Sequence, residues 1–283
     1  MEYRIHKEDL QNELLAETLQ ALDGCYKQLG ADVYVVGAAA RDIALRLLKV
    51  TNTPRRTMDL DVAVMLRDWR QYERLTGILL QNHFEKAQEK QRFFYLGSNE
   101  RIRFEVDIVP FGAIAVDEIV AWPPEGSPVM SVRCIKDVLQ AADKVTVDGD
   151  FAFRLASLSG QFLIKLDTWC DRRMTTKKDA VDMAFLLQNV YVAYALAHDG
   201  LPSEVDTNAE QFDVIVAGAE WMAADLKGML TDEHRSFYSA MLRGELAKNE
   251  ESPLLNDLLD VSDSRNYKLY LRAFDRMAQI LGK

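Results

Sequence analysis

Met58-Asp-Leu-Asp-Val-Ala-Val-Met65 alternates apolar and acidic side chains with the period of two that is typical of a β-strand. An apolar face for the core is formed by Met58, Leu60, Val62 and Val64. Asp59 and Asp61 therefore lie side by side on the opposite face of the strand. Two carboxylates held that close together repel each other, so the pattern needs an explanation.

A second stretch, Ile102-Arg-Phe-Glu-Val-Asp-Ile-Val109, shows the same alternation and places Asp107 with Glu105 on its acidic face. If the two strands are neighbours in one sheet, three or four carboxylates converge on one surface. Mg²⁺ is the natural counter-charge, because it binds carboxylate oxygens and shares its remaining positions with phosphates and water. The alternative is that Asp59 and Asp61 lie on the solvated face of an edge strand and bind nothing.

The segment upstream of these aspartates favours a site. Val33-Tyr-Val-Val36 predicts a short buried strand that ends at Gly37, and a helix is expected directly after it, over residues 38–49. A glycine at a strand–helix junction lets backbone N–H groups approach a phosphate, whose charge the helix N-terminus stabilises. Followed about twenty residues later by Asp-x-Asp on a strand, this junction indicates a nucleotide site.

Length and patterning predict two domains from the 283 residues. Short apolar strands alternate with helical segments as far as residue 150, and almost every later pattern is helical. We therefore expect an α/β (α+β) domain with a mixed sheet over residues 1–150. An all-helical domain over residues 151–283 is expected to close the active-site cleft.

Individual elements follow from periodicity and from turn residues. In the first domain we expect helices at Glu13–Leu29, capped by Gly30, and at Trp69–Phe84. Strands at 92–97 and 101–109 would form a hairpin turning at Ser98-Asn99, residues 110–128 would be irregular, and residues 144–153 would add a second hairpin. In the second domain helices are expected at 155–170, 177–197, 209–230, 232–248 and 262–281, with a charged bend over residues 248–253.

Composition excludes several function classes. A net charge of −10 is evidence against broad, non-specific duplex binding, which needs a basic face. The three cysteines and four histidines are scattered without metal-ligand spacing. No apolar run reaches the length of about 18 residues that spans a bilayer, and the first residues lack the apolar core of a signal peptide. We expect a cytoplasmic protein with reduced thiols and no membrane association.

The order Gly37-Ala38, Asp59-x-Asp61 and then a strand carrying Asp107 resembles the DNA polymerase beta nucleotidyltransferase superfamily. Within it, the chain looks most like the AbiEii/AbiGii toxin family. The segments that carry this likeness, over roughly residues 30–190, are Val36-Gly-Ala-Ala-Ala-Arg-Asp42, Asp107-Ile-Val-Pro-Phe-Gly112, Ala121-Trp-Pro-Pro124, Lys165-Leu-Asp-Thr-Trp-Cys-Asp-Arg172 and Lys178-Asp-Ala-Val-Asp-Met183.

The resemblance implies a role for each matching residue. Asp59, Asp61 and Asp107 would bind two Mg²⁺ ions, and Asp107 would also deprotonate the acceptor hydroxyl. The Gly37-Ala38 turn would bind the triphosphate, with Arg41 in the same segment as a further contact. The family usually has Gly-Ser or Gly-Gly where this chain has Gly37-Ala38, so a serine hydroxyl is missing and phosphate binding is expected to be weaker.

The resemblance places Lys165 and an acidic residue between Asp179 and Asp182 in the family's third and fourth motifs. From the residues alone, Lys165 lies beside an apolar helix face, where it either extends to solvent or reaches a triphosphate or the acceptor. Asp182 could hold Lys165 or an arginine. Asp179 has a structural alternative, because Thr176-Lys-Lys-Asp179 resembles a capping box.

Two basic clusters, Arg55-Arg56 and Arg172-Arg173 with Lys177-Lys178, are either solvated loop and helix ends or groups that attract a triphosphate or an RNA end. Trp69 and Trp169 are expected in the core, and nothing singles out Tyr95 as a base-stacking residue.

The sequence thus predicts Mg²⁺-dependent transfer of a nucleoside monophosphate from an NTP to an acceptor hydroxyl. That acceptor would be a tRNA end, a protein or a small molecule, and the resemblance implies a toxin with a possible antitoxin partner. Two alternatives remain open at this stage. One is a non-catalytic protein that binds an NTP and signals to a partner, and the other is an acidic face without a ligand.

Overall fold

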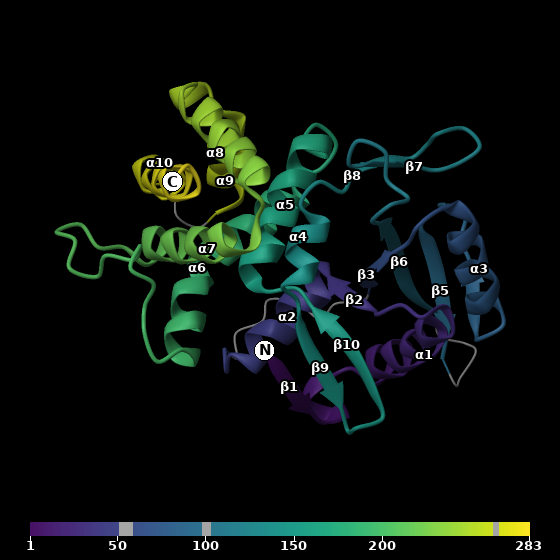
Figure 1. Ribbon diagram of the computed structural model, residues 1–283. Coiled ribbons are helices and arrows are strands. Elements are labelled where there is room, and N and C mark those ends of the chain that lie inside the picture. Colours follow the sequence, from purple (N-terminus) through teal and green to yellow (C-terminus); the bar gives the residue numbers. More distant parts are fainter. Residues whose placement is uncertain (51–58, 98–102, 263–265) are drawn as a thin grey trace. The chain divides into compact units, whose positions relative to one another are not determined.

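The computed structural model describes residues 1–50, 59–97, 103–262 and 266–283 (Figure 1). Its chain divides into two compact units. The first comprises Met1–Arg46 and Thr51–Ser157, and the second comprises Leu47–Val50 and Leu158–Lys283. The expected mixed α/β sheet followed by helices is confirmed. The boundary expected at residue 150 falls between two strands of the same sheet.

The first unit is built on an eight-stranded mixed sheet with the order β1-β9-β10-β2-β3-β6-β5-β4 in the described residues. The neighbours β1/β9, β10/β2 and β3/β6 are parallel, and the remaining neighbours are antiparallel. The strands are β1 (Glu2–Ile5), β2 (Tyr34–Val36), β3 (Asp59–Met65), β4 (Phe84–Lys86), β5 (Arg92–Leu96), β6 (Arg103–Phe111), β9 (Asp143–Val147) and β10 (Phe151–Leu155). A separate antiparallel pair joins β7 (Ile119–Ala121) to β8 (Val129–Ser131).

Helix α1 covers part of this sheet. It packs on β6 and β10 and against α3 (Figure 1), and it buries the completely inaccessible side chains of Leu19, Leu22 and Tyr26. The helices of this unit are η1 (Lys7–Leu10), α1 (Glu13–Leu29), α2 (Gly37–Leu47), α3 (Trp69–Leu80) and α4 (Ile135–Gln140). The bounds expected for α1 and its left-handed cap at Gly30, with φ of +71°, are confirmed.

Several expected boundaries in the first unit are wrong. The helix expected over Trp69–Phe84 ends at Leu80, because His83 takes a positive φ of 64° and Phe84 opens β4, which pairs with β5. The hairpin of β5 and β6 and the hairpin of β9 and β10 are confirmed. The turn expected at Ser98-Asn99 lies outside the described residues, and so does Met58 of the first acidic strand.

The second unit is helical. Its elements are α5 (Leu158–Arg172), α6 (Lys178–Ala197), α7 (Val214–Met229), α8 (Asp232–Leu246), η2 (Asn249–Glu251), α9 (Pro253–Val261) and α10 (Tyr267–Leu281). Helix α6 packs on α5, α7 and α9, and α10 packs on α7, α8 and α9. Among the described residues, α6 is also the one helix long and apolar enough to cross a membrane by length and composition, with 44% of that window buried inside the protein.

Helix starts in this unit differ from expectation for physical reasons. Leu155 belongs to β10, so α5 begins at Leu158 rather than at residue 155. The caps Asp213 and Asn266 delay the starts of α7 and α10. The bend expected over residues 248–253 contains η2, and Ser252 caps the unexpected helix α9 by accepting the N–H of Leu255.

Candidate functional site

The two acidic strands are direct neighbours in the sheet. Strands β3 and β6 run parallel, and their register pairs Asp61 with Asp107 and Asp59 with Glu105. The alternate residues Leu60, Val62 and Val64 are fully buried, so the four carboxylates project from the opposite face. The predicted convergence of acidic side chains is therefore present, and it follows from the period of two in both strands.

The junction at Gly37 lies against this acidic face. Strand β2 pairs with β3 in a register that opposes Val36 to Asp61, and helix α2 begins at the next residue, Gly37. Gly37 has a φ of +70°, and a Cβ built on it would lie 2.1 Å from Oδ2 of Asp61. Only glycine leaves room for that carboxylate at the first turn of α2. The geometry thus brings the predicted phosphate-binding turn and the Asp-x-Asp pair together.

Arg92 is the residue that sequence reasoning missed. It opens β5 directly opposite Asp107, and its guanidinium holds both oxygens of that carboxylate, with Nε 2.8 Å from Oδ1 and Nη2 2.9 Å from Oδ2. The same Nη2 lies 2.8 Å from Oε1 of Glu105, and Nη1 lies 4.0 Å from Oε1 of Glu89. An internal cation thus neutralises part of the acidic face.

The pKa of Glu105 reflects this crowding. Partial burial raises its pKa above the ordinary value, and Arg92 opposes that shift by stabilising the carboxylate. The neighbouring charges of Asp107, Asp59 and Glu89 raise the pKa further. The pKa of Arg92 is itself raised, first by its hydrogen bond to Asp107, so the arginine stays charged.

Helix α2 also carries two predicted phosphate contacts. Ala38 is partly exposed beside Gly37 in the first turn of the helix. Arg41 is 7% exposed, and its Nε lies 3.0 Å from Oδ1 of Asp42, which is 3% exposed. Burial of this pair within the fold favours a structural role for Arg41 over contact with a ligand.

In the second unit, Lys165, Asp179, Asp182 and Arg172 form one ionic cluster between α5 and α6. Nζ of Lys165 lies 2.8 Å from Oδ2 of Asp182 and 3.4 Å from Oδ1 of Asp179. Arg172 donates to both oxygens of Asp179, at 2.7 Å from Nε and 2.9 Å from Nη2. The suggestion that Asp182 could hold Lys165 agrees with these contacts.

Asp179 is 1% exposed at the start of α6. Burial alone would raise the pKa of its carboxyl, but the hydrogen bond from Arg172 and the charge of Lys165 bring the pKa below its usual value. The expected capping box is wrong. Lys177 is the N-cap residue and makes no side-chain cap bond, and the Thr176 hydroxyl accepts the N–H of Lys178. The helix therefore starts without Asp179 acting as a cap partner.

The residues of the two predicted basic clusters, and the two tryptophans expected in the core, have the following surroundings. Arg55 and Arg56 lie outside the described residues. Arg173 stacks on Trp169, 5.4 Å from the ring centroid, and Lys177 pairs with Asp257 and Asp260, so these cations have structural partners. Trp169 is buried, as expected, whereas Trp69 is partly exposed.

Tyr95 and the cysteines have ordinary surroundings. The side chain of Tyr95 is buried, and its ring packs on Phe84 at a centroid distance of 5.1 Å, so it has no exposed face for a base. The thiols of Cys25 and Cys134 are buried, whereas that of Cys170 is exposed, and none of the three is in a disulfide bond. Neither observation adds a residue to the candidate site.

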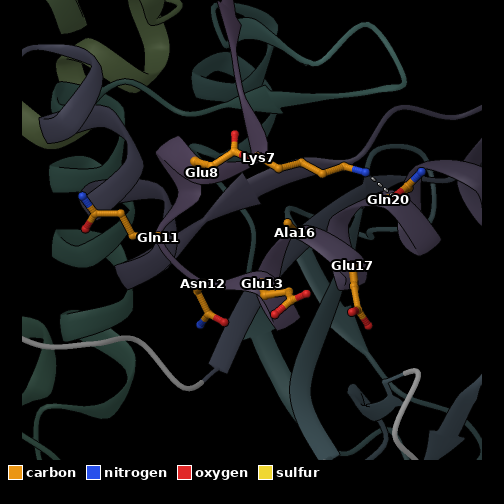
Figure 2. Close-up of a pocket in the computed structure, with 8 residues that line it drawn as sticks. All are labelled: Lys7, Glu8, Gln11, Asn12, Glu13, Ala16, Glu17 and Gln20. Atoms are coloured by element: carbon orange, nitrogen blue, oxygen red, sulfur yellow. Dashed lines mark hydrogen bonds between the residues drawn. The ribbon is translucent and has the colours of Figure 1, made fainter.

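A hollow of about 450 Å³ lies elsewhere on the first unit, along η1 and the first turns of α1 (Figure 2). Its lining is polar apart from Ala16, and Lys7 crosses it to donate to Oε1 of Gln20 at 3.2 Å. None of the predicted site residues lines this hollow. The apolar walls that usually enclose a small-molecule site are also lacking among its lining residues.

Comparisons with known proteins identify no family. No protein-family model matches the chain, and no curated protein matches it. One solved structure with a remote likeness is the Thermotoga maritima CCA-adding enzyme complexed with tRNA. It is 10% identical, over 98% of this chain and 84% of that chain, with a TM-score of 0.27. At that level of similarity the match says nothing about the activity or the ligands of this chain.

Proposed function

We propose that this chain is a Mg²⁺-dependent nucleotidyltransferase that moves a nucleoside monophosphate from an NTP to an acceptor hydroxyl and releases pyrophosphate. One observation carries the proposal. Asp61 on β3 and Asp107 on β6 are paired in register, and the Gly37 turn at the start of α2 packs directly on Asp61. A metal–triphosphate complex requires two kinds of group. Carboxylates bind the metal ion, and the helix N-terminus beside them binds the phosphates.

The donor chemistry of the acidic face fits Mg²⁺, with one condition. Asp59, Asp61 and Asp107 supply carboxylate oxygens, which are the ligands this ion prefers. Within the described ranges, however, no group of three or more His, Cys, Asp or Glu side chains is arranged to hold a metal ion. Arg92 occupies both oxygens of Asp107. A site with three carboxylates therefore requires Asp107 to turn from Arg92.

The proposed roles follow from position. Asp59 and Asp61 would hold the metal ions, and Asp107 would complete their ligands and orient the acceptor hydroxyl for proton loss. Mg²⁺ bound there would stabilise the charge that develops as a phosphoryl group is transferred. Backbone N–H groups of Gly37 and Ala38 would bind the β- and γ-phosphates, with the alanine supplying no hydroxyl. Lys165 stays a predicted contact of the triphosphate, supported by sequence resemblance alone.

The acceptor and the biological role are the finer part of the proposal. A tRNA end, a protein side chain and a small molecule are the acceptors to be tested, because a fold does not determine its substrate. The toxin role, with an antitoxin partner, rests on the sequence resemblance. Growth arrest on induced expression of the wild type, but not of Asp61→Asn, would support it, and equal growth of both strains would contradict it.

The experiment is label transfer from each α-³²P NTP, with Mg²⁺, into total tRNA and into cell lysate. Wild type is compared with Asp61→Asn and with Glu73→Gln, which removes a charge on the exposed part of α3. Label in wild type and Glu73→Gln, but not in Asp61→Asn, supports the transferase and shows the class of acceptor. Equal labelling by Asp61→Asn would contradict the assignment of the site.

A non-catalytic NTP-binding protein is the second candidate, and two observations favour it. Arg92 holds the carboxylate of Asp107, and Ala38 stands where the family that the sequence resembles usually has a serine or a glycine, so no hydroxyl is present there. Thermal shift with NTP and Mg²⁺ separates the two functions. A shift that depends on NTP, without label transfer to any acceptor, would favour the binding protein. Transfer at any acceptor would exclude it.

A further inference from the structure

The acidic face contains its own counter-ion. Four carboxylates, from Asp59, Asp61, Glu105 and Asp107, share one face of neighbouring strands, and the guanidinium of Arg92 contacts two of them. Arg92 is anchored by its place in the sheet, because its Cα pairs with that of Asp107. The side chain of Arg92 is 26% exposed, and that of Asp107 is 21% exposed. The pair is therefore only partly shielded from solvent, and its hydrogen bonds are charge-assisted.

Arg92 also has other partners within reach. Its Nη2 already lies 2.8 Å from Oε1 of Glu105, and its Nη1 lies 4.0 Å from Oε1 of Glu89, a carboxylate on the approach to β5. If the guanidinium turned from Asp107, it would keep Glu105 as a partner and would have Glu89 nearby. Neither glutamate is among the carboxylates proposed to hold the metal ions. The arginine can therefore release Asp107 without becoming an unpaired charge.

We propose that Arg92 is a positioning residue that acts as an exchangeable cation. It occupies Asp107 in the metal-free protein and moves to Glu105 and Glu89 when a divalent ion binds. This inference rests on the proposed function, because it concerns the same carboxylates. The physical reason is competition. A guanidinium and a metal ion bind the same carboxylate oxygens, and their like charges repel each other when both lie beside one carboxylate. Arg92 thereby lowers the metal affinity of the empty site.

The test is titration with Mn²⁺ alone, followed by electron paramagnetic resonance of the free ion. Arg92→Gln removes the cation and is expected to bind Mn²⁺ roughly threefold to thirtyfold more tightly than wild type. The matched control is Arg103→Gln. Arg103 lies on β6 and pairs with Glu85 at 2.9 Å. Its substitution therefore removes the same charge from the same pair of strands without removing a contact of Asp107. Its affinity is expected to stay within about twofold of wild type.

A third variant keeps the test valid if Arg92→Gln does not fold. Arg92→Lys retains the charge but cannot grip both oxygens, so its affinity is expected to lie between those of wild type and Arg92→Gln. Adding Asp61→Asn to the tighter-binding variant should abolish the gain, which places the gain at these carboxylates. A merely structural role of Arg92 would not tighten metal binding.

The outcomes separate this inference from the proposed function. Tighter Mn²⁺ binding by Arg92→Gln and Arg92→Lys, with no gain in Arg103→Gln, supports the exchange. Wild type that binds Mn²⁺ as tightly as both Arg92 variants overturns the exchange and leaves the transferase standing. If wild type and both variants bind no Mn²⁺, with or without NTP, the proposed function fails and the inference fails with it.

Discussion

The carboxylate of Asp61 rests on the backbone of Gly37, at a place where a Cβ would come within 2.1 Å of Oδ2. This contact joins two segments that are separate in sequence, the β2–α2 junction and strand β3. It couples the conformation of the helix N-terminus to the position of a proposed metal ligand. A change at Gly37 therefore acts on the carboxylate directly, which makes the relationship testable.

Gly37→Ala is expected to displace Asp61 and destabilise the protein. The left-handed backbone costs about 1–2 kcal/mol for an alanine, and the clash adds about 1–3 kcal/mol more. Gly30→Ala is the matched control, since Gly30 has nearly the same φ, +71°, and open space around its Cβ position. Urea denaturation of both variants measures the difference. Equal losses in the two variants would contradict a close contact at Asp61, and label transfer is expected to fall only in Gly37→Ala.

Asp107→Asn is expected to lower the free energy of unfolding of the metal-free protein by about 0.5–1.5 kcal/mol. The loss is modest because the pair with Arg92 is partly exposed and screened. Asp59→Asn removes an exposed carboxylate from the same acidic face and should leave stability unchanged or slightly higher. Chemical denaturation in EDTA compares them. A larger loss in Asp59→Asn would show that Arg92 does not stabilise this face through Asp107.

Lys165→Met is expected to destabilise the protein by about 1–3 kcal/mol, because it removes the cation that contacts Asp182 at 2.8 Å and Asp179 at 3.4 Å. Lys178→Met, at an exposed position that begins α6, serves as the control and should change stability by less than about 0.5 kcal/mol. Thermal unfolding measures both. If Lys165 also contacts the triphosphate, Lys165→Met raises the KM for NTP under conditions in which the variant is still folded. An unchanged KM would assign the lysine to structure.

Asp179 is expected to make stability depend on pH. Its folded-state pKa is lowered, despite burial, by Arg172 and Lys165. Its contribution is therefore present above the unfolded pKa of about 3.9 and is lost as pH falls through the folded pKa. At pH 7, Asp179→Asn should cost about 2–4 kcal/mol, and its deficit relative to wild type should shrink below pH 4. A deficit that stays constant from pH 7 to pH 3 would contradict an ionised Asp179.

Much of the acidic face could be predicted from alternation alone. The period of two fixes which side chains share a face within one strand, so it places Asp59, Asp61 and Asp107 opposite the core. Alternation does not predict that β3 and β6 are neighbours. The sheet order interleaves strands from distant parts of the chain, and no local pattern specifies such an order.

Arg92 shows why register matters to a site. A two-residue turn at Ser98-Asn99 would pair residue 97 with residue 100, and hence Arg92 with Glu105. The observed pairs, Leu96 with Arg103 and Arg92 with Asp107, are shifted by two residues along β6. A shift of two keeps each side chain on its face. The hairpin pattern therefore contained enough information to place Arg92 near the carboxylates, although not to choose its partner.

Helix α9 was missed although its signals were present. Ser252 followed by Pro253 is a serine cap with proline at the first helical position, which is a common start of a helix. The charged residues before it favour a bend, which is the structure predicted there in place of a helix start. In the ionic cluster, by contrast, the suggestion that Asp182 could hold Lys165 or an arginine agrees with the contact between Lys165 and Asp182. The grip of Arg172 on Asp179 depends on the turn between α5 and α6, which periodicity does not describe.

The first and last strands of the sheet impose an order on folding. Strand β1 has β9 as its partner, with Glu2 opposite Lys144, and β10 joins β9 to β2. A growing chain therefore holds β1 unpaired until more than 140 residues later, and β2 keeps an open edge until β10 has emerged. A chain that stops at residue 150 would contain β1 and β9 but lack the strand that connects them to the acidic strands. The sheet that carries Asp61 and Asp107 is thus completed late in synthesis, by a hairpin that contributes no carboxylate to their face.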